Sequence, residues 1–177
     1  MLLLQLTGLS GAGKTTLACA VQQHLLPLGF KVELIDGDVY RQTLCRDLGF
    51  SKADRVENIR RLGFVGLQMM RHEVIVLLAA INPYETARAQ LAAQSPNVKT
   101  IYVACPIPVL TERDTKGLYR RAALPPDDPQ HVAHFTGVSD PYEVPLQPDL
   151  TIDTSQETIE NATQRIIDFI LKQIKTD

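Results

Sequence analysis

The chain has 177 residues, which is enough for one domain with a buried core. Hydrophobic residues make up 45% of it and charged residues 21%, the proportions of an ordinary globular protein. Its formal net charge of −2 provides no overall positive field that would gather nucleic acid or a membrane surface. Any binding site for an anion must therefore be local.

Cysteine usage and apolar runs predict a cytoplasmic protein. Cys19, Cys45 and Cys105 lack the spacing of a metal site, and free thiols fit a reducing compartment. The opening run MLLLQL is too short for a signal peptide and has no basic residues before it. No apolar run approaches the roughly 18 residues of a membrane helix.

Short apolar runs alternate with helical patterns along the chain. The expected strands are Leu2–Thr7, Val32–Ile35, Val74–Ile81, Lys99–Ala104 and Leu150–Ile152. The expected helices are Lys14–Leu26, Val56–His72 and a last helix with an apolar stripe of Ile159, Ala162, Ile166, Ile170 and Ile174. Thr154 and Glu157 have capping-box spacing, which predicts the start of that last helix.

This order predicts an α/β fold of three layers, the P-loop NTPase fold, with a mostly parallel five-stranded sheet and helices on both faces. Ligands of such sheets lie at the carboxyl ends of the strands. Polar clusters follow three expected strands there, namely GLSGAGKTT, DGDVYR and NPYETAR. The irregular stretch from Thr115 to Pro148 is interpreted as a mobile surface segment, so residues 1–177 form a single domain.

The first cluster predicts a site for nucleotide phosphates. Gly8, Gly13, Lys14 and Thr15 match the pattern G-x-x-x-x-G-K-[ST]. The glycines let main-chain N–H groups curl around phosphate oxygens, and the following helix offers its positive N-terminus. Lys14 can reach the β- and γ-phosphates, and the Thr15 hydroxyl is placed to bind Mg²⁺. The residues expected to bind ATP in this loop are Gly8, Ser10, Gly11, Ala12, Gly13, Lys14, Thr15 and Thr16.

The second cluster favours a kinase of small molecules. The chain has no N-K-x-D guanine-binding motif, and the strand VIVLLAAI ends without an acidic metal ligand. Asp36 and Asp38 follow the second strand instead. Asp38 is predicted to orient an acceptor hydroxyl and take its proton, although capping of a turn is the alternative. Asp36 is expected to hold Mg²⁺ through water or to hold the loop itself.

The segment LGFSKADRVENIRR predicts a pocket for an anionic acceptor. Arg55 and Asn58 share a helix face, and Arg41 belongs to the preceding loop. Phe50 and Phe135 each lie beside a glycine-containing polar loop, where they would stack on a base from two sides or pack in the core.

The motifs GLSGAGKTT, DGDVYR, LGFSKADRVENIRR, INPY, RDTKGLY and FTGVSDPYEVP resemble those of adenylylsulfate kinases, in the same order, up to about Leu150. The resemblance implies transfer of the ATP γ-phosphoryl group to the ribose 3′-hydroxyl of adenosine 5′-phosphosulfate, and a homodimer. The implied acceptor contacts are Asp38, Arg41, Phe50, Arg55, Asn58, Ile81, Asn82, Lys116 and Phe135. Phe50 and Phe135 would clamp the adenine, and Arg41 and Arg55 would face the phosphosulfate.

A basic segment, ERDTKGLYRRA, adds a candidate lid at about residues 113–137. Arg113 is expected to bind ATP, and Lys116 is expected to act in catalysis together with Lys14 and Asp38. The alternative is a solvated basic helix face, which is favoured for Arg121.

Several positions depart from the family pattern. Asn82 replaces a serine, so a phosphoenzyme at this position is excluded and direct in-line transfer is expected. Thr115 and Ala123 replace a proline and an arginine, and the link LPPDDPQHVAH is longer than usual. Two alternatives therefore stay open: a kinase of the same fold acting on another small hydroxyl compound, and a non-catalytic nucleotide-binding regulatory module.

Overall fold

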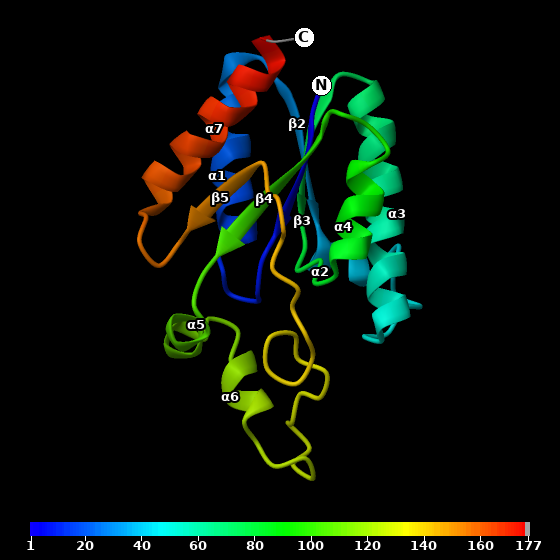
Figure 1. Cartoon of the computed structure of the whole chain (residues 1–177), viewed down its shortest axis with the longest axis vertical. Coiled ribbons are helices and arrows are strands. Elements are labelled where there is room, and N and C mark those ends of the chain that lie inside the picture. The colour runs from blue at the N-terminus through cyan, green and yellow to red at the C-terminus, as the bar shows by residue number, and fades with distance from the viewer. Residues whose placement is uncertain (176–177) are drawn as a thin grey trace.

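A computed structural model of the chain describes residues 1–175. Its centre is a sheet of five parallel strands in the order β2-β3-β1-β4-β5 (Figure 1). The strands are β1 (Leu3–Thr7), β2 (Lys31–Asp36), β3 (Val74–Ala79), β4 (Val98–Ala104) and β5 (Leu150–Asp153). The predicted α/β class with its parallel sheet is confirmed.

Helices cover both faces of the sheet (Figure 1). One face carries α1 (Lys14–Leu25), which is followed by the short 3₁₀ turn η1 (Leu26–Leu28), and α7 (Ile159–Lys175). The other face carries α3 (Lys52–Arg71) and α4 (Glu85–Ala92). The short helices α2 (Gly37–Arg41), α5 (Ile107–Arg113) and α6 (Leu118–Ala122) lie at or beyond the carboxyl ends of the strands.

Strand β1 lies between β3 and β4, and every one of its residues is buried. Because side chains alternate along a strand, Leu4 and Leu6 enter the core beneath α1 and α7, and Leu3 enters the core beneath α3. Gln5 and Thr7 share the face of Leu3 but are polar, so this face changes character toward the carboxyl end of the strand.

Local capping explains where the helices differ from expectation. The Ser51 hydroxyl accepts the N–H of Asp54, so α3 begins at Lys52, four residues earlier than predicted. The segment DGDVYR is the helix α2 with Asp36 as its N-cap, and not an open loop. Strand β3 ends at Ala79, two residues short of the expected Ile81.

The expected capping box of the last helix is wrong. The Thr154 hydroxyl instead donates to the carbonyl oxygens of Ala12 and Ala104, and the helix begins at Ile159. The N–H of Asn161 bonds the Thr158 hydroxyl, which makes Thr158 the cap. The stripe is otherwise as predicted, with Ala162, Ile166 and Ile170 buried, but Ile159 is 52% exposed.

Among residues 1–175, we find no helix with the length and apolar character that a bilayer crossing requires. Cys19, Cys45 and Cys105 are free thiols.

A close approach of main chains predicts the effect of one substitution. A Cβ at Gly8 would lie 2.3 Å from the Val103 carbonyl oxygen, and moving that oxygen disturbs the pairing of β1 with β4. We expect Gly8→Ala to lower the free energy of unfolding by about 3 kcal/mol, the upper range for over-packing. Gly29→Ala is the control, because Gly29 has φ +87° and no atom within 4 Å, so only the strain of roughly 1 kcal/mol applies. Equal losses in urea unfolding of the two variants would contradict this account.

Candidate active site

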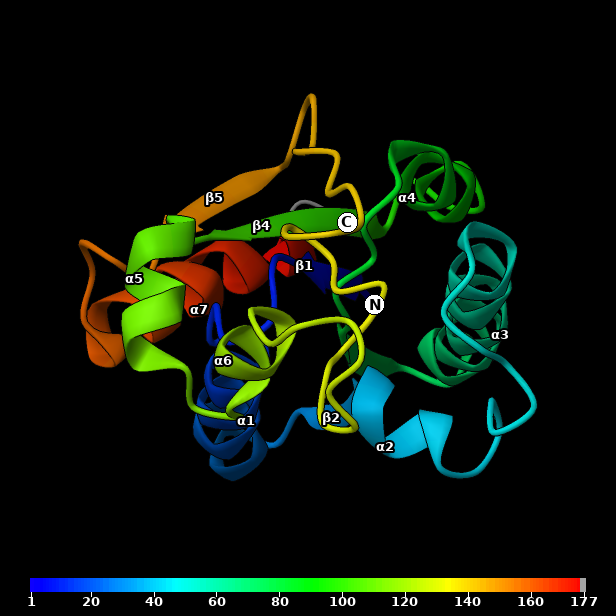
Figure 2. The same cartoon turned by 90° about the horizontal axis from the view of Figure 1, so that it is seen from below.

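A cavity of about 370 Å³ opens at the carboxyl ends of the strands. Its walls come from the loop between β1 and α1, from Asp36 and Asp38, from Ala79–Ile81 after β3, and from part of the segment 115–136. In Figure 2, which looks onto this end of the molecule, α6 and the chain that follows it lie across the edge of the sheet. The site is therefore where the parallel topology predicts it.

Glycines shape the loop that leads into α1. Gly11 has φ +77°, and Gly13, the N-cap of α1, has φ +94°. Residues with a Cβ rarely adopt this left-handed conformation, so glycine is needed at both positions. The loop places the N-terminus of the 12-residue helix α1 at the wall of the cavity, where its free N–H groups and its dipole favour an anion.

Lys14 is a buried cation in this loop. Its ammonium donates to the carbonyl oxygens of Gly8 and Leu9 at 2.9 and 2.8 Å. The pKa of Lys14 is lowered to about 8, mainly because burial penalises the charged ammonium. Asp38 opposes this shift, Lys116 adds to it, and Asp36 opposes it more weakly. A negatively charged ligand beside this ammonium would restore its usual pKa.

Thr15 and Asp36 link the loop to α2. The Thr15 hydroxyl donates to Asp36 Oδ2 at 2.6 Å. The other oxygen of Asp36 accepts the N–H groups of Asp38 and Val39 at 2.8 and 3.3 Å. Asp36 therefore holds the start of α2, and it places a carboxylate beside the Thr15 hydroxyl, a pair of oxygen ligands of the kind that Mg²⁺ accepts. Among residues 1–175 no group of three or more His, Cys, Asp or Glu residues could hold a metal ion.

Asp38 pairs with Lys116 across the cavity. The ammonium of Lys116 donates to Asp38 Oδ2 at 2.5 Å, and both side chains are more than half exposed. This contact joins the segment that precedes α6 to the start of α2. It brings a carboxylate and an ammonium to the mouth of the cavity, close to the phosphate-binding loop.

Two aromatic side chains line the same cavity. Phe50 is 56% exposed, and the guanidiniums of Arg41 and Arg55 lie 4.7 and 5.4 Å from its ring centroid. Phe135 is only 6% exposed and packs edge-on against Tyr119, with ring centroids 4.9 Å apart. Phe135 therefore belongs to the core and also forms a wall of the cavity, two roles that the sequence presented as alternatives.

Arg55 links the two segments that carry these rings. Its Nε donates to the carbonyl of Phe50 at 2.9 Å, and its Nη2 donates to the carbonyl of His134 at 2.6 Å. Nη2 also contacts the carboxylate of Asp140 at 3.2 Å, and the Arg55 side chain is 7% exposed. Because His134 directly precedes Phe135, one buried guanidinium sets the distance between the two aromatic segments.

A second, smaller cavity of about 70 Å³ adjoins the first and shares Asp38, Phe50 and Arg55 with it. Asn58 and Asn82 line it, and the Oδ1 atom of each is buried without a hydrogen-bond partner among the described residues. Asn82 has φ +43°, a left-handed conformation that asparagine tolerates better than most residues.

The structure brings together most of the predicted site residues. The large cavity is lined by Ser10, Gly11, Gly13, Lys14, Thr15, Thr16, Asp36, Asp38, Phe50, Arg55, Ile81, Lys116 and Phe135. The smaller cavity adds Arg41, Asn58 and Asn82. Gly8, Ala12 and Arg113 line neither cavity, although the Gly8 carbonyl binds Lys14.

The basic side chains of the segment ERDTKGLYRRA do not lie together. Arg113 donates to the carbonyl of Thr154 at 2.7 Å, beside the phosphate-binding loop, and Arg121 donates to the carbonyl of Gln130 at 3.0 Å. Of the basic side chains in this segment, only Lys116 lines the cavity.

Sequence analysis missed Tyr119 and Thr136. The Tyr119 hydroxyl donates to the carbonyl of Ser10 in the phosphate-binding loop at 3.0 Å, and its ring supports Phe135. Thr136 lines the cavity with a buried hydroxyl that has no partner among the described residues. Both residues stand in motifs that the sequence analysis quoted, Tyr119 in RDTKGLY and Thr136 in FTGVSDPYEVP, but no role was predicted for either.

Comparisons with known proteins agree on one family. The family model for adenylylsulphate kinase matches residues 1–153. The adenylyl-sulfate kinase of Synechococcus sp. (strain JA-3-3Ab) is 45% identical over 170 residues, which cover 96% of this chain and 92% of that protein. The APS kinase of Mycobacterium tuberculosis, in a structure with AMPPNP and APS, has a TM-score of 0.88 and 35% identity over 96% of both chains. A hexameric APS kinase from Thiobacillus denitrificans has a TM-score of 0.71 and 34% identity, and it matches 97% of this chain but 29% of its own.

The lowered pKa of Lys14 predicts that ATP binding takes up protons near pH 8. At that pH about half of the free protein has lost the Lys14 proton, and a bound triphosphate restores it. We therefore expect uptake of about half a proton per ATP bound at pH 8 and much less at pH 6, where Lys14 is already charged. Titration calorimetry in buffers with different ionisation enthalpies measures this uptake, and Lys14→Met should abolish it. An equal uptake at both pH values would contradict the prediction.

Proposed function

The chain belongs to the adenylylsulphate kinase family, and from that membership we propose how its residues perform the reaction. The enzyme transfers the γ-phosphoryl group of ATP to the ribose 3′-hydroxyl of adenosine 5′-phosphosulfate, and the products are ADP and 3′-phosphoadenosine 5′-phosphosulfate. One observation supports the assignment of roles most strongly. A single cavity is lined by the phosphate-binding loop, by the Asp38–Lys116 pair and by Phe50 and Phe135.

The donor ATP lies on the loop between β1 and α1. Main-chain N–H groups at the start of α1 and the ammonium of Lys14 bind its phosphates. The hydroxyl of Thr15 and, through water, Asp36 would hold Mg²⁺, which would neutralise charge on the phosphates. Arg113, which lies beside this loop through its bond to Thr154, contacts the nucleotide.

The acceptor lies between the two cavities. Its adenine ring stacks between Phe50 and Phe135, with each stacked contact contributing about 1–3 kcal/mol. Arg41 and Arg55 face the phosphosulfate group, and both already lie over the Phe50 ring. Asn58 and the main chain at Ile81–Asn82 complete the pocket, where the unpartnered Oδ1 of Asn58 is available to accept a hydrogen bond from the substrate.

Transfer is direct and in line. Asp38 orients the 3′-hydroxyl and takes its proton, and Lys116 stabilises negative charge that develops on the transferred group. In the structure the side chains of Asp38 and Lys116 form an exposed ion pair with each other. When the substrates bind, this pair separates, and Asp38 contacts the 3′-hydroxyl while Lys116 contacts the phosphoryl oxygens. Asn82 is an amide with 3% exposure, so it cannot serve as a phosphoryl carrier.

The wider organisation of the chain is part of the same proposal. Residues 1–177 act as one kinase domain, and the segment of about 113–137 closes over both substrates and excludes water. The chain works in the cytoplasm, where its free thiols stay reduced. It forms a homodimer, an expectation that rests on the family.

A substrate comparison tests the function. With ATP and Mg²⁺, we expect the wild type to form 3′-phosphoadenosine 5′-phosphosulfate from adenosine 5′-phosphosulfate, and to phosphorylate AMP and adenosine poorly because these lack the sulfate or the whole anionic group. Lys14→Ala should show no transfer to any of these acceptors, since the donor phosphates lose their cation. The proposed function is wrong if the wild type prefers AMP or a different alcohol, and the donor site is wrong if Lys14→Ala turns over normally.

A substitution at Asp38 separates chemistry from ATP binding. We expect Asp38→Asn to lower kcat by about 10²- to 10⁴-fold, the usual contribution of a general base. The Kd for an ATP analogue should change by less than about twofold, because the amide leaves the phosphate-binding loop intact. Asp47→Asn is the matched control, since Asp47 is an exposed aspartate paired with Arg61 outside both cavities. An unchanged kcat in Asp38→Asn would place the base elsewhere.

A further inference from the structure

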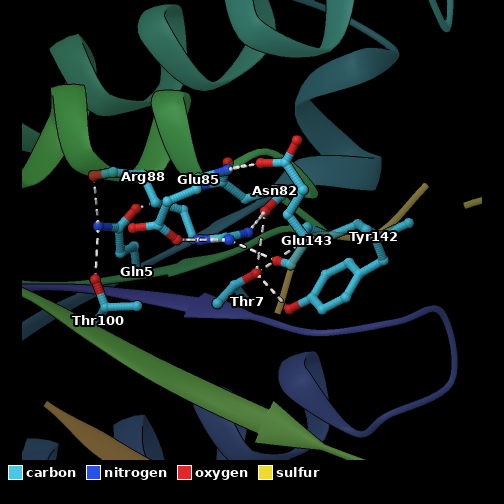
Figure 3. Close-up of polar contacts among 9 residues, drawn as sticks. Gln5, Thr7, Asn82, Glu85, Arg88, Thr100, Tyr142 and Glu143 are labelled. Atoms are coloured by element: carbon cyan, nitrogen blue, oxygen red, sulfur yellow. Dashed lines mark hydrogen bonds and ion pairs between the residues drawn. The ribbon is translucent and has the colours of Figure 1, made fainter. Parts of the chain in front are cut away.

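A largely buried polar network lies between the sheet and α4 (Figure 3), and one of its members, Asn82, lines the smaller cavity. Its members come from five parts of the chain: Gln5 and Thr7 of β1, Thr100 of β4, Asn82 after β3, Glu85 and Arg88 of α4, and Tyr142 and Glu143 beyond the candidate lid. Figure 3 shows the Arg88 side chain at the centre of these contacts.

Arg88 is a buried cation with 2% exposure. Its Nε and Nη2 donate to Glu85 Oε2 at 3.1 and 2.7 Å. Its Nη1 donates to the carbonyl of Asn82 at 2.7 Å, and its Nη2 also donates to the carbonyl of Glu143 at 2.5 Å. Removing a guanidinium from water is costly, so the surrounding chain is held to the geometry that satisfies these donors.

The two carbonyl partners belong to the two segments that enclose the acceptor. Asn82 and the adjacent Ile81 line the smaller cavity. Glu143 lies three residues after Asp140, which pairs with Arg55, and the loop from Phe135 to Asp140 is closed by main-chain hydrogen bonds. The planar guanidinium of Arg88 thereby fixes the Asn82 turn relative to the segment that leads back to Phe135.

Strand β1 anchors the other side of the network. The Gln5 amide donates to the carbonyl of Arg88 at 3.1 Å, and its Oε1 accepts from the Asn82 amide at 3.1 Å. The Thr7 hydroxyl contacts the carbonyls of Ile81 and Asn82 and the hydroxyl of Tyr142. The Tyr142 ring lies beneath Arg88, at 5.8 Å from its guanidinium carbon. The Asn82 turn is therefore hydrogen-bonded both to β1, through Gln5 and Thr7, and to α4, through Arg88.

The geometry points to Arg88 as a positioning residue for the acceptor substrate: through the carbonyls of Asn82 and Glu143, it holds the Ile81–Asn82 main chain and the segment carrying Phe135 at the spacing that adenosine 5′-phosphosulfate requires. The inference rests on the proposed function. Arg88 lines neither cavity and has no direct hydrogen bond to the phosphate-binding loop, so we expect its effect on the acceptor half of the site to exceed its effect on the donor half.

Arg88→Lys tests this role, because lysine keeps the charge but cannot bridge the two carbonyls. We expect Kd and KM for adenosine 5′-phosphosulfate to rise about tenfold, because the groups that bind it are displaced. The Kd for a non-hydrolysable ATP analogue should stay within about twofold of the wild-type value. Arg60→Lys is the matched control, since Arg60 makes the same i,i+3 pair with Glu57 on α3 but is 67% exposed. It should leave both affinities unchanged.

Tyr142→Phe is a milder second variant. It removes the hydroxyl contact with Thr7 but keeps the ring under Arg88, so the fold is retained, and the Kd for adenosine 5′-phosphosulfate should rise about two- to threefold. If Arg88→Lys does not fold, this variant decides the question, and an unchanged Kd would overturn the inference.

A stabilising role alone gives a different result. Loss of affinity for both substrates together, or a lower unfolding temperature with both affinities unchanged, would show that Arg88 only supports the fold, and the inference would be wrong. Wild-type protein that does not phosphorylate adenosine 5′-phosphosulfate would reject the proposed function itself. Normal wild-type turnover with an unaltered Arg88→Lys variant would reject only the role of Arg88.

Discussion

Burial of β1 in the middle of the sheet is the constraint on which the site depends. Both faces of this strand are covered, so its side chains must be apolar or have hydrogen-bond partners. The chain that follows the strand reaches the surface at the carboxyl edge of the sheet. At that edge the main chain of Gly8 packs closely against Val103 of β4, and the phosphate-binding loop begins there. The same strand turns polar at Gln5 and Thr7, which hold the Asn82 turn. One buried strand thus positions the phosphate-binding loop through its main chain and the proposed acceptor pocket through its side chains.

The ion pairs of the site are of two kinds, and their exposure separates them. Asp38 and Lys116 are 69% and 53% exposed, and such a pair contributes little to stability because water screens both charges. Breaking this pair therefore costs little free energy, as the proposed contacts of Asp38 and Lys116 with the substrates require. Arg55 and Asp140 are 7% and 17% exposed, and separating them would leave a buried charge unpaired. The groups assigned to chemistry are thus free to rearrange, whereas those that set the shape of the pocket are not.

The sequence predicted those parts of the molecule whose signals are local. The phosphate-binding loop is one contiguous motif, β3 is a continuous apolar run and β1 is a mostly apolar one, so all three were found. The capping box at Thr154 failed because its hydroxyl binds the carbonyl of Ala12, a residue 142 positions away that spacing cannot reveal. Arg88 was missed for the same reason. It stands in the polar stretch NPYETAR, and only the packing of α4 against β4 and the return of Glu143 bury it.

The donor and acceptor halves differ because they satisfy main-chain polar groups in different ways. The donor half uses the N-terminus of α1, where a regular helix supplies the free N–H groups. The proposed acceptor half also includes irregular segments, and the carbonyls of Phe50, Asn82, His134 and Glu143 lie outside the strands and helices. Two buried guanidiniums donate to these carbonyls: Arg55 binds those of Phe50 and His134, and Arg88 binds those of Asn82 and Glu143. A planar fork of donors fixes the directions of its partners, so irregular chain acquires the rigidity that the proposed stacking of an adenine requires.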